Sequence, residues 1–249
     1  MQCYRMNNVF IDAAVAELQL PPAPKAASCI EETYAQYGED RIVLALLRAL
    51  VCDRGGRSFQ SACYVEIGGN HPIRNSNTWL LYKAGCRGLL VEPNPELAAL
   101  LAHVRSRDTV ISAAVVPDHR ERVILHLGRY DELSSLRADH IESFGAFGGL
   151  GGIERSIHVP ALNINAILQR IPAQVDYLSV DVEGLDVDLL AALDFSRFRP
   201  TIIQAEPSEH FLRGNTQRMI NLMHGNKYVL LARTEGNCIF FDTRCLLPI

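Results

Sequence analysis

The chain has 249 residues, of which 48% are hydrophobic and 21% are charged. These proportions are close to those of globular domains and exclude a chain that is disordered throughout. Its 24 Lys and Arg residues against 28 Asp and Glu give a net charge of −4, so we expect no nucleic-acid partner and no binding to anionic membranes.

The first 28 residues are predicted to form a segment of their own. Residues 9–20 could form a short amphipathic helix, which the tract Pro21-Pro22-Ala23-Pro24 would end. We find neither a signal peptide nor a run of about 20 apolar residues that could span a membrane. We therefore expect an N-terminal arm with a Pro-rich linker at 1–28 and one main domain at 29–249. The arm could pack against a second copy of the chain, as a homodimer, or fold back on its own domain.

The cysteines indicate a reducing compartment. There are seven of them, an odd number, and no pair has the C-x-x-C spacing of a metal or redox site. Reduced thiols in a cytoplasmic protein are the simplest interpretation.

Short apolar runs alternate with helical stretches along the main domain. Strands are predicted at 63–67, 89–91, 109–116, 122–127, 177–182, 201–205, 228–232 and 238–241, and helices at 39–50, from near 76, after 94, at 163–170, from 185 and at 216–224. The strand at 122–127 could be a hairpin partner of the strand before it. The pattern predicts an α/β doubly wound sheet in which a terminal hairpin contributes one antiparallel strand. The Gly-rich segment 144–152 is either a surface connector or a lid over the substrate.

Ligands of a doubly wound sheet bind beyond the carboxyl ends of its strands, so the residues that follow each strand are the candidates. The first strand leads into Gly68-Gly69-Asn70, a turn that lets a ligand approach the backbone closely. The G-x-G-x-x-G dinucleotide pattern is not met, and a Walker lysine is missing, which disfavours ordinary NAD or ATP binding. Glu92-Pro93 ends the second strand, one β-α-β step after the Gly-Gly turn. A carboxylate there could accept hydrogen bonds from a ribose, or it could be a helix-capping or surface acid.

Further carboxylates follow the next two buried strands. Asp181 and Glu183 come after the strand at 177–182, and Glu206 follows the strand at 201–205, with His210 four residues later. Residues 181 and 183 would point to the same side, so they could converge with Glu206. Such a cluster in an apolar frame requires a cation, a cationic ligand or a shared proton. Alternatively, Glu183 complements a helix dipole and His210 is a surface residue.

Five segments in this order resemble the FkbM-type family of S-adenosylmethionine (SAM)-dependent methyltransferases. They are Tyr34-Ala-Gln-Tyr-Gly-Glu-Asp40, Val65-Glu-Ile-Gly-Gly-Asn-His-Pro72, Ser76-Asn-Thr-Trp-Leu-Leu-Tyr82, Gly88-Leu-Leu-Val-Glu-Pro-Asn94 and Tyr177-Leu-Ser-Val-Asp-Val-Glu-Gly184. The resemblance covers roughly residues 34–242. It implies a Rossmann-like class I methyltransferase fold with a seven-stranded sheet, and methylation of a hydroxyl on a sugar of a surface polysaccharide or secondary metabolite.

The resemblance also implies roles for individual residues. Glu66, Gly68 and Asn70 would lie at the methionine end of SAM, and Glu92 would hold the ribose. Ser112, Ala113 and Ala114 would border the adenine, and Gln36 and Asp40 would close over the cofactor. Gly69, Ser76 and Pro93 are further cofactor-binding candidates. Asp181, with Glu183 beside it, would face the reacting centre.

Methyl transfer from a sulfonium is an in-line displacement that removes a positive charge, which suits a site bordered by carboxylates. An alcohol acceptor also needs a base or a metal ion, and Asp181, Glu206 and His210 are the candidate catalytic residues. Mg²⁺ held by Asp181 and Glu206 is the metal alternative. Two other functions stay open: a non-catalytic subunit that binds SAM or a nucleoside, and an oxidoreductase with an atypical dinucleotide loop.

Overall fold

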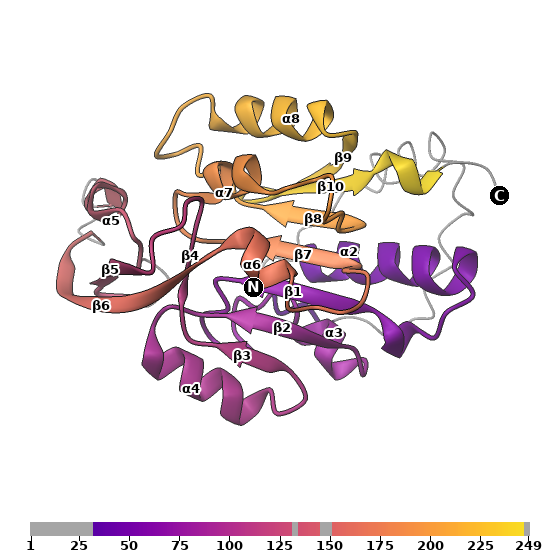
Figure 1. Cartoon of the computed structure of the whole chain (residues 1–249), viewed down its shortest axis with the longest axis horizontal. Coiled ribbons are helices and arrows are strands. Elements are labelled where there is room, and N and C mark those ends of the chain that lie inside the picture. The colour runs from indigo at the N-terminus through magenta and orange to yellow at the C-terminus, as the bar shows by residue number, and fades with distance from the viewer. Residues whose placement is uncertain (1–31, 131–133, 145–150, 247–249) are drawn as a thin grey trace.

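The computed structural model describes residues 32–130, 134–144 and 151–246 (Figure 1). The predicted arm at 1–28 lies outside the described residues, and so does most of the Gly-rich segment. The domain boundary at residue 28 therefore stays a prediction.

A seven-stranded sheet forms the centre of the molecule, as predicted. Its strands lie in the order β3-β2-β1-β7-β8-β10-β9, and β10 runs antiparallel to both of its neighbours. The strand bounds are Cys63–Ile67 (β1), Arg87–Val91 (β2), Thr109–Ile111 (β3), Tyr177–Val180 (β7), Ile202–Ala205 (β8), Tyr228–Arg233 (β9) and Cys238–Asp242 (β10). The predicted terminal hairpin is confirmed as β9 and β10, and the fold is the predicted Rossmann-like α/β fold with a mostly parallel sheet.

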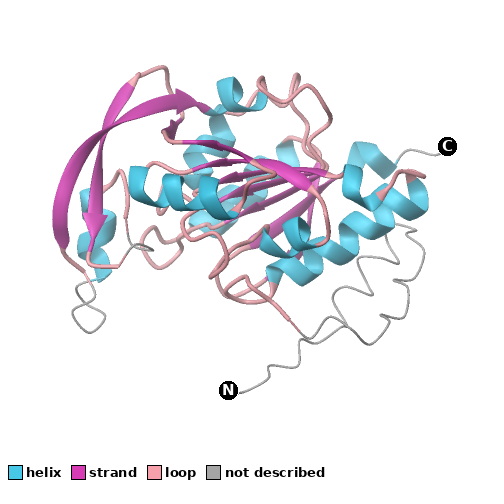
Figure 2. Ribbon diagram, turned by 90° about the horizontal axis from the view of Figure 1, so that it is seen from below, coloured by secondary structure: helices cyan, strands magenta, loops and turns pink. Residues whose placement is uncertain are grey.

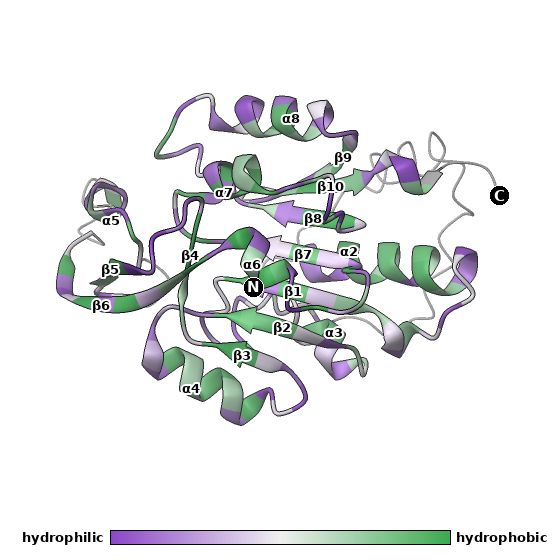
Figure 3. Ribbon diagram, in the orientation of Figure 1, coloured by the Kyte–Doolittle hydropathy of each residue, from purple (hydrophilic) through white to green (hydrophobic). Residues whose placement is uncertain are grey.

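Helices cover both faces of this sheet (Figure 2). One face packs against α2 (Glu39–Leu47), α3 (Trp79–Lys83) and α4 (Pro95–Val104), and the other against α6 (Ile164–Leu168), α7 (Asp186–Ala192) and α8 (Asn215–Gly225). Successive side chains of a strand point to opposite faces of the sheet. Tyr64 therefore belongs to the hydrophobic core under α2, α3 and α4, and Val65 to the core under α6, α7 and α8. Helix α8 is striped with hydrophobic and hydrophilic residues, as expected when only one side rests on the sheet (Figure 3).

A second, three-stranded sheet stands beside the carboxyl ends of the main strands. It consists of Ala114–Val116 (β4), Ile153–Asn163 (β6) and Arg122–Gly128 (β5), in the order β4-β6-β5, with helix α5 (Ala138–Ser143) between β5 and β6 in sequence. The predicted strand at 109–116 is divided between the two sheets. The predicted hairpin of 122–127 with its predecessor is wrong, because β6 lies between β4 and β5. The first half of β6, residues 153–158, is mostly polar and largely exposed, so it carries little strand signal.

The helices follow the predictions with shifts at their ends. The predicted helix at 39–50 is confirmed, and it continues as a π-helical stretch at Arg48–Arg54. The helix expected from near Ser76 begins only at Trp79, because the Ser76 hydroxyl accepts a hydrogen bond from the Trp79 backbone N–H at 3.1 Å. Short 3-10 helices lie at Phe59–Ser61 and Thr243–Leu246. Among the described residues, none of these helices is long and apolar enough to cross a membrane.

Candidate active site

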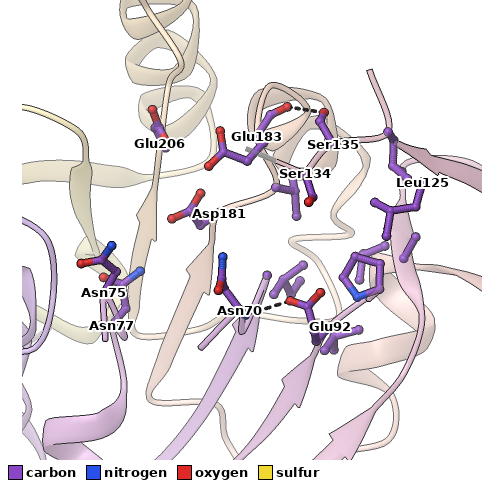
Figure 4. Close-up of a pocket in the computed structure, with 18 of the residues that line it drawn as sticks. Asn70, Asn75, Asn77, Glu92, Leu125, Ser134, Ser135, Asp181, Glu183 and Glu206 are labelled. Atoms are coloured by element: carbon purple, nitrogen blue, oxygen red, sulfur yellow. Dashed lines mark hydrogen bonds between the residues drawn. The ribbon is translucent and has the colours of Figure 1, made fainter. Parts of the chain in front are cut away.

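A pocket of about 310 Å³ lies where the carboxyl ends of β1, β2, β7 and β8 meet the three-stranded sheet (Figure 4). The following predicted residues line it: Gln36, Gly68, Asn70, Glu92, Pro93, Ala113, Ala114, Asp181, Glu183, Glu206 and His210. Lysine and arginine are missing from the described lining residues. The pocket is therefore polar and strongly acidic.

The turn after β1 has a backbone that requires glycine. Gly68 has φ 88°, and a Cβ on it would lie 1.7 Å from the carbonyl oxygen of Asp181. The strands β1 and β7 therefore approach closely at this point. Asn70, with φ 41°, lines the pocket.

Glu92 connects two backbone segments at one end of the pocket. Its side chain is buried, and its two oxygens accept hydrogen bonds from the backbone N–H groups of Asn70 at 2.8 Å and Asn94 at 2.7 Å. Asn94 in turn accepts from Glu96 N and caps α4. Each carboxylate oxygen has a further lone pair, so Glu92 can hold these loops and still accept hydrogen bonds from a ribose.

Three carboxylates converge at the other end. One oxygen from each of Asp181, Glu183 and Glu206 lies within 4.8 Å of the others. Asp181 lies between Asn70 and the two glutamates, as Figure 4 shows. Its Oδ1 is buried and has no hydrogen-bond partner in the described part of the chain.

Burial makes ionisation of this cluster unfavourable. It raises the pKa of Asp181 to about 6 and that of Glu206 to about 9, and for Glu206 the negative charge of Asp181 adds to the effect. Asp186, buried at the start of α7, has its pKa raised by burial and by Asp181. These carboxyl groups titrate together, and a bound cation would favour their ionised forms.

His210 stands beside Glu206, with 4.0 Å between its Nδ1 and Glu206 Oε1. Burial lowers the pKa of His210, which favours a neutral ring that can accept a proton.

Five predicted cofactor residues do not line the pocket. Glu66 is buried behind it and accepts hydrogen bonds from Asn77 N at 3.1 Å and Thr78 Oγ1 at 2.5 Å. Burial raises the pKa of Glu66 to about 7. Glu66 thus shapes the loop that carries Asn75 and Asn77, both of which do line the pocket.

The other four are directed elsewhere by their local contacts. Asp40 accepts hydrogen bonds from Thr33 Oγ1 at 2.6 Å and Tyr34 N at 2.8 Å, and so holds the start of the described chain. Ser76 is bonded to α3, as described above. Gly69 faces Leu101 of α4, and Ser112 is exposed at the break between β3 and β4.

Several lining residues were not predicted: Tyr37, Asn75, Asn77, Leu125, Ser134, Ser135, Leu136, Phe144 and Asn237. Most belong to loops or to the segment between β5 and β6, where the sequence lacks a strand-end pattern. Tyr37 and Asn77 lie inside two of the segments that carry the family resemblance. Only that position in the motifs could have identified them as site residues from the sequence.

The fold and the site define an α/β protein with an acidic pocket at the carboxyl ends of its parallel strands. The sequence matches the methyltransferase FkbM domain over residues 66–230, which is more than half of the chain. The chain therefore belongs to the FkbM methyltransferase family and is a SAM-dependent methyltransferase. The predicted family is confirmed, whereas neither the oxidoreductase nor the non-catalytic alternative fits this assignment.

Comparison with curated proteins finds no match. Among solved structures, the fold is similar to the SAH-bound methyltransferase PaMTH1 of Podospora anserina (TM-score 0.42, 10% identity, 97% of this chain and 99% of that chain). It is also similar to an O-methyltransferase of Bacillus cereus in complex with SAH (0.39, 9%, 95% and 92%). A third is TomG of Streptomyces achromogenes, an O-methyltransferase involved in tomaymycin synthesis, in complex with SAM (0.38, 13%, 96% and 91%). These similarities are distant, and the family assignment rests on the domain match.

Proposed function

We propose that this methyltransferase transfers the methyl group of SAM to a hydroxyl of a sugar or sugar-containing small molecule, in polysaccharide or natural-product biosynthesis. The observation that carries the proposal is the convergence of Asp181, Glu183 and Glu206 in the same pocket as Glu92. The sugar acceptor follows from the family resemblance. It is supported by the polar neutral side chains of the lining, such as Asn75, Asn77 and Ser134, which suit a ligand rich in hydroxyls.

SAM would lie along the pocket from Glu92 to Asp181. With the ribose on Glu92 and the adenine toward Pro93 and Ala113, the sulfonium would point to the acidic end. Asn70 stands between the two ends in Figure 4, beside the expected path of the methionine part. SAM carries one net positive charge and its product S-adenosylhomocysteine (SAH) carries none, so the acidic end favours the reactant over the product.

The reaction transfers the methyl from sulfur to the acceptor oxygen, while the hydroxyl proton passes to a base and SAH leaves. Glu206 is the base that we favour, because its raised pKa makes its carboxylate more basic than an ordinary one. Asp181 would face the sulfonium, whose charge favours the ionised form of both carboxyls. His210, whose lowered pKa keeps its ring neutral, stands 4.0 Å from Glu206 and is the alternative base.

A divalent cation is the second proposal for the cluster. Carboxylate oxygens are the hard ligands that Mg²⁺ prefers, and the buried Oδ1 of Asp181, for which the described chain offers no hydrogen-bond partner, fits such a role. Asp181 and Glu206 would hold the ion, which would stabilise an ionised acceptor oxygen. Activity that survives EDTA and Mg²⁺-free dialysis would exclude it.

The predictions about partners and location remain proposals. The five cysteines at 52, 63, 86, 238 and 245 are free, which supports a reducing, cytoplasmic environment. The acidic lining of the pocket supports an acceptor other than DNA or RNA. Dimer formation through the arm stays a prediction that sedimentation velocity can test.

The direct test is transfer of radiolabelled methyl from SAM to a panel of glycosides, with matched alcohols, amines and carboxylic acids that lack a sugar. We expect label in a glycoside as an alkali-stable ether, and at least a 100-fold loss of transfer in Asp181→Asn. Label only in amines or in alkali-labile esters would contradict the proposal. Undiminished transfer by Asp181→Asn would remove the catalytic assignment of that residue.

A further inference from the structure

His140 lies next to the acidic cluster and has no assigned role. It belongs to α5, in the segment between β5 and β6, and its side chain is fully buried. Neither ring nitrogen has a hydrogen-bond partner among the residues that the structure describes, although a buried imidazole normally has one. Its Nε2 lies 3.7 Å from Glu183 Oε2, and its ring contacts those of Phe144, Phe211 and His210 at centroid distances of 5.3, 4.9 and 5.5 Å.

Glu183 has a backbone conformation that non-glycine residues rarely adopt. Its φ is 56°, and Gly184 follows with φ 102°. A glutamate with a left-handed backbone conformation persists only where the surrounding structure holds it, and such residues cluster at functional sites. Here the Ser135 hydroxyl donates to the Glu183 carbonyl oxygen at 2.8 Å, as Figure 4 shows.

The β5–β6 segment therefore holds Glu183 from two sides. Ser135 is anchored to β5 through paired backbone hydrogen bonds with His126 at 2.9 and 3.0 Å. His140 closes the other side, because a Cβ on Gly184 would lie 3.0 Å from its Cδ2. This leaves the Glu183 carboxylate between the imidazole and the oxygens of Asp181 and Glu206.

We infer that His140 is a positioning residue that donates its Nε2–H to Glu183 and so fixes that carboxylate toward the positive charge of SAM. At 3.7 Å the two atoms are beyond hydrogen-bond length, and a small rotation of Glu183 brings them into contact. Such bonds often shorten only when the ligand is bound. Burial and the neighbouring His210 and Arg137 lower the pKa of His140 to about 4, so at neutral pH the imidazole is uncharged and carries one N–H. It can therefore orient Glu183 without neutralising it.

The inference rests on the proposed orientation of SAM, and the test uses ligands that do not require the acceptor. Sinefungin carries an ammonium group where SAM has its methylsulfonium, whereas SAH has a neutral sulfur. Titration calorimetry at pH 7.5 gives the ratio of the Kd of SAH to the Kd of sinefungin, which measures how strongly the site selects positive charge. Four variants are compared with the wild type: Glu183→Gln, His140→Phe, His140→Gln, and Glu142→Gln on the exposed side of α5 as the matched control.

We expect Glu183→Gln to lower this ratio about tenfold, as for loss of one charge-assisted contact. His140→Phe keeps an aromatic ring in the cluster but has no N–H, and should lower the ratio three- to tenfold. His140→Gln restores a donor near the Nε2 position and should recover at least half of that loss on a logarithmic scale. Glu142→Gln should match the wild type.

The outcomes separate the inference from the proposed function. If Glu183→Gln lowers the ratio and His140→Phe does not, the positioning role of His140 is wrong and the orientation of SAM stands. If Glu183→Gln leaves the ratio unchanged, the carboxylate does not face the charge of SAM, and both fail. Loss in His140→Phe without recovery in His140→Gln, together with a lower melting temperature or weaker SAH binding, would assign His140 to packing alone.

Discussion

The two ends of the pocket hold their carboxylates in opposite ways. Glu92 accepts backbone N–H bonds on both oxygens, so it is held in place before any ligand arrives. Asp181 and Glu206 lie close together with raised pKa values, and one Asp181 oxygen has no hydrogen-bond partner among the described residues. In our proposal one end is preorganised for a neutral ribose, whereas ionisation of the other end is unfavourable until positive charge binds. This difference would orient SAM, because only its sulfonium end relieves the repulsion.

The largest effect, on the rate of methyl transfer, is expected from a substitution in the acidic cluster. Asp181→Asn keeps the shape of the side chain and removes its charge, so methyl transfer should fall by about 100- to 1000-fold, as for loss of one preorganised electrostatic group. SAH affinity should change less than threefold, because SAH has no positive sulfur. Single-turnover rates and calorimetry measure the two quantities. An equal loss in both would place Asp181 in cofactor binding and not in the reaction.

The ribose end gives the next effect. Glu92→Ala removes the proposed acceptor of two ribose hydroxyls and the acceptor of two backbone N–H groups, so SAH affinity should fall about 100-fold. The control is Glu121→Ala, a change of an exposed glutamate in the loop before β5. Unchanged SAH affinity in Glu92→Ala would show that the ribose binds elsewhere.

Stability should depend on pH through the acidic end. Asp181 and Glu206 have higher pKa values in the folded chain than in the unfolded chain, so the native state binds more protons. The unfolding free energy of the ligand-free protein should therefore fall as pH rises from about 6.5 toward 9. Below that range the lowered pKa values of His140 and His210 act in the opposite direction. Between pH 6.5 and 9 we expect a loss of about 2–4 kcal/mol, or roughly 4–16 °C in melting temperature.

The matched variant is Glu206→Gln, in which this decline should be much shallower. SAM should stabilise the wild type more at pH 9 than at pH 6, because it binds the ionised cluster. Melting curves across this range test both points. A wild-type stability that rises with pH would contradict the assigned pKa directions.

The smallest effect tests the edge of the pocket. Ser112 is exposed and does not line the pocket, so Ser112→Ala should change SAH affinity less than twofold. A larger change would mean that the residue moves to the adenine when the cofactor binds.

The main sheet was predictable because its strands are short, apolar and separated by helices with clear periodicity. The residues at strand ends, such as Glu92, Asp181 and Glu206, could be placed in one site because the carboxyl ends of parallel strands meet there. The three-stranded sheet was not predictable, since the first half of β6 is mostly polar and exposed and the strand pairs with β4 and β5 across long sequence separations.

The role of α5 was not predictable for the same reason. Nothing in the sequence relates His140 to Glu183, 43 residues away, because their contact depends on how the β5–β6 segment folds back over β7. Glu66 shows the converse case, in which a motif residue next to the pocket is turned inward by its bonds to Asn77 and Thr78. A motif identifies the strand end, whereas side-chain direction depends on tertiary contacts.

A crystal structure of the SAH complex tests the central claim most directly. Our account predicts both ribose hydroxyls within about 2.6–3.0 Å of the Glu92 carboxylate and the sulfur directed toward Asp181, Glu183 and Glu206. A nucleoside bound in the reverse direction, with its sulfur beside Glu92 or its adenine against the acidic cluster, would contradict it.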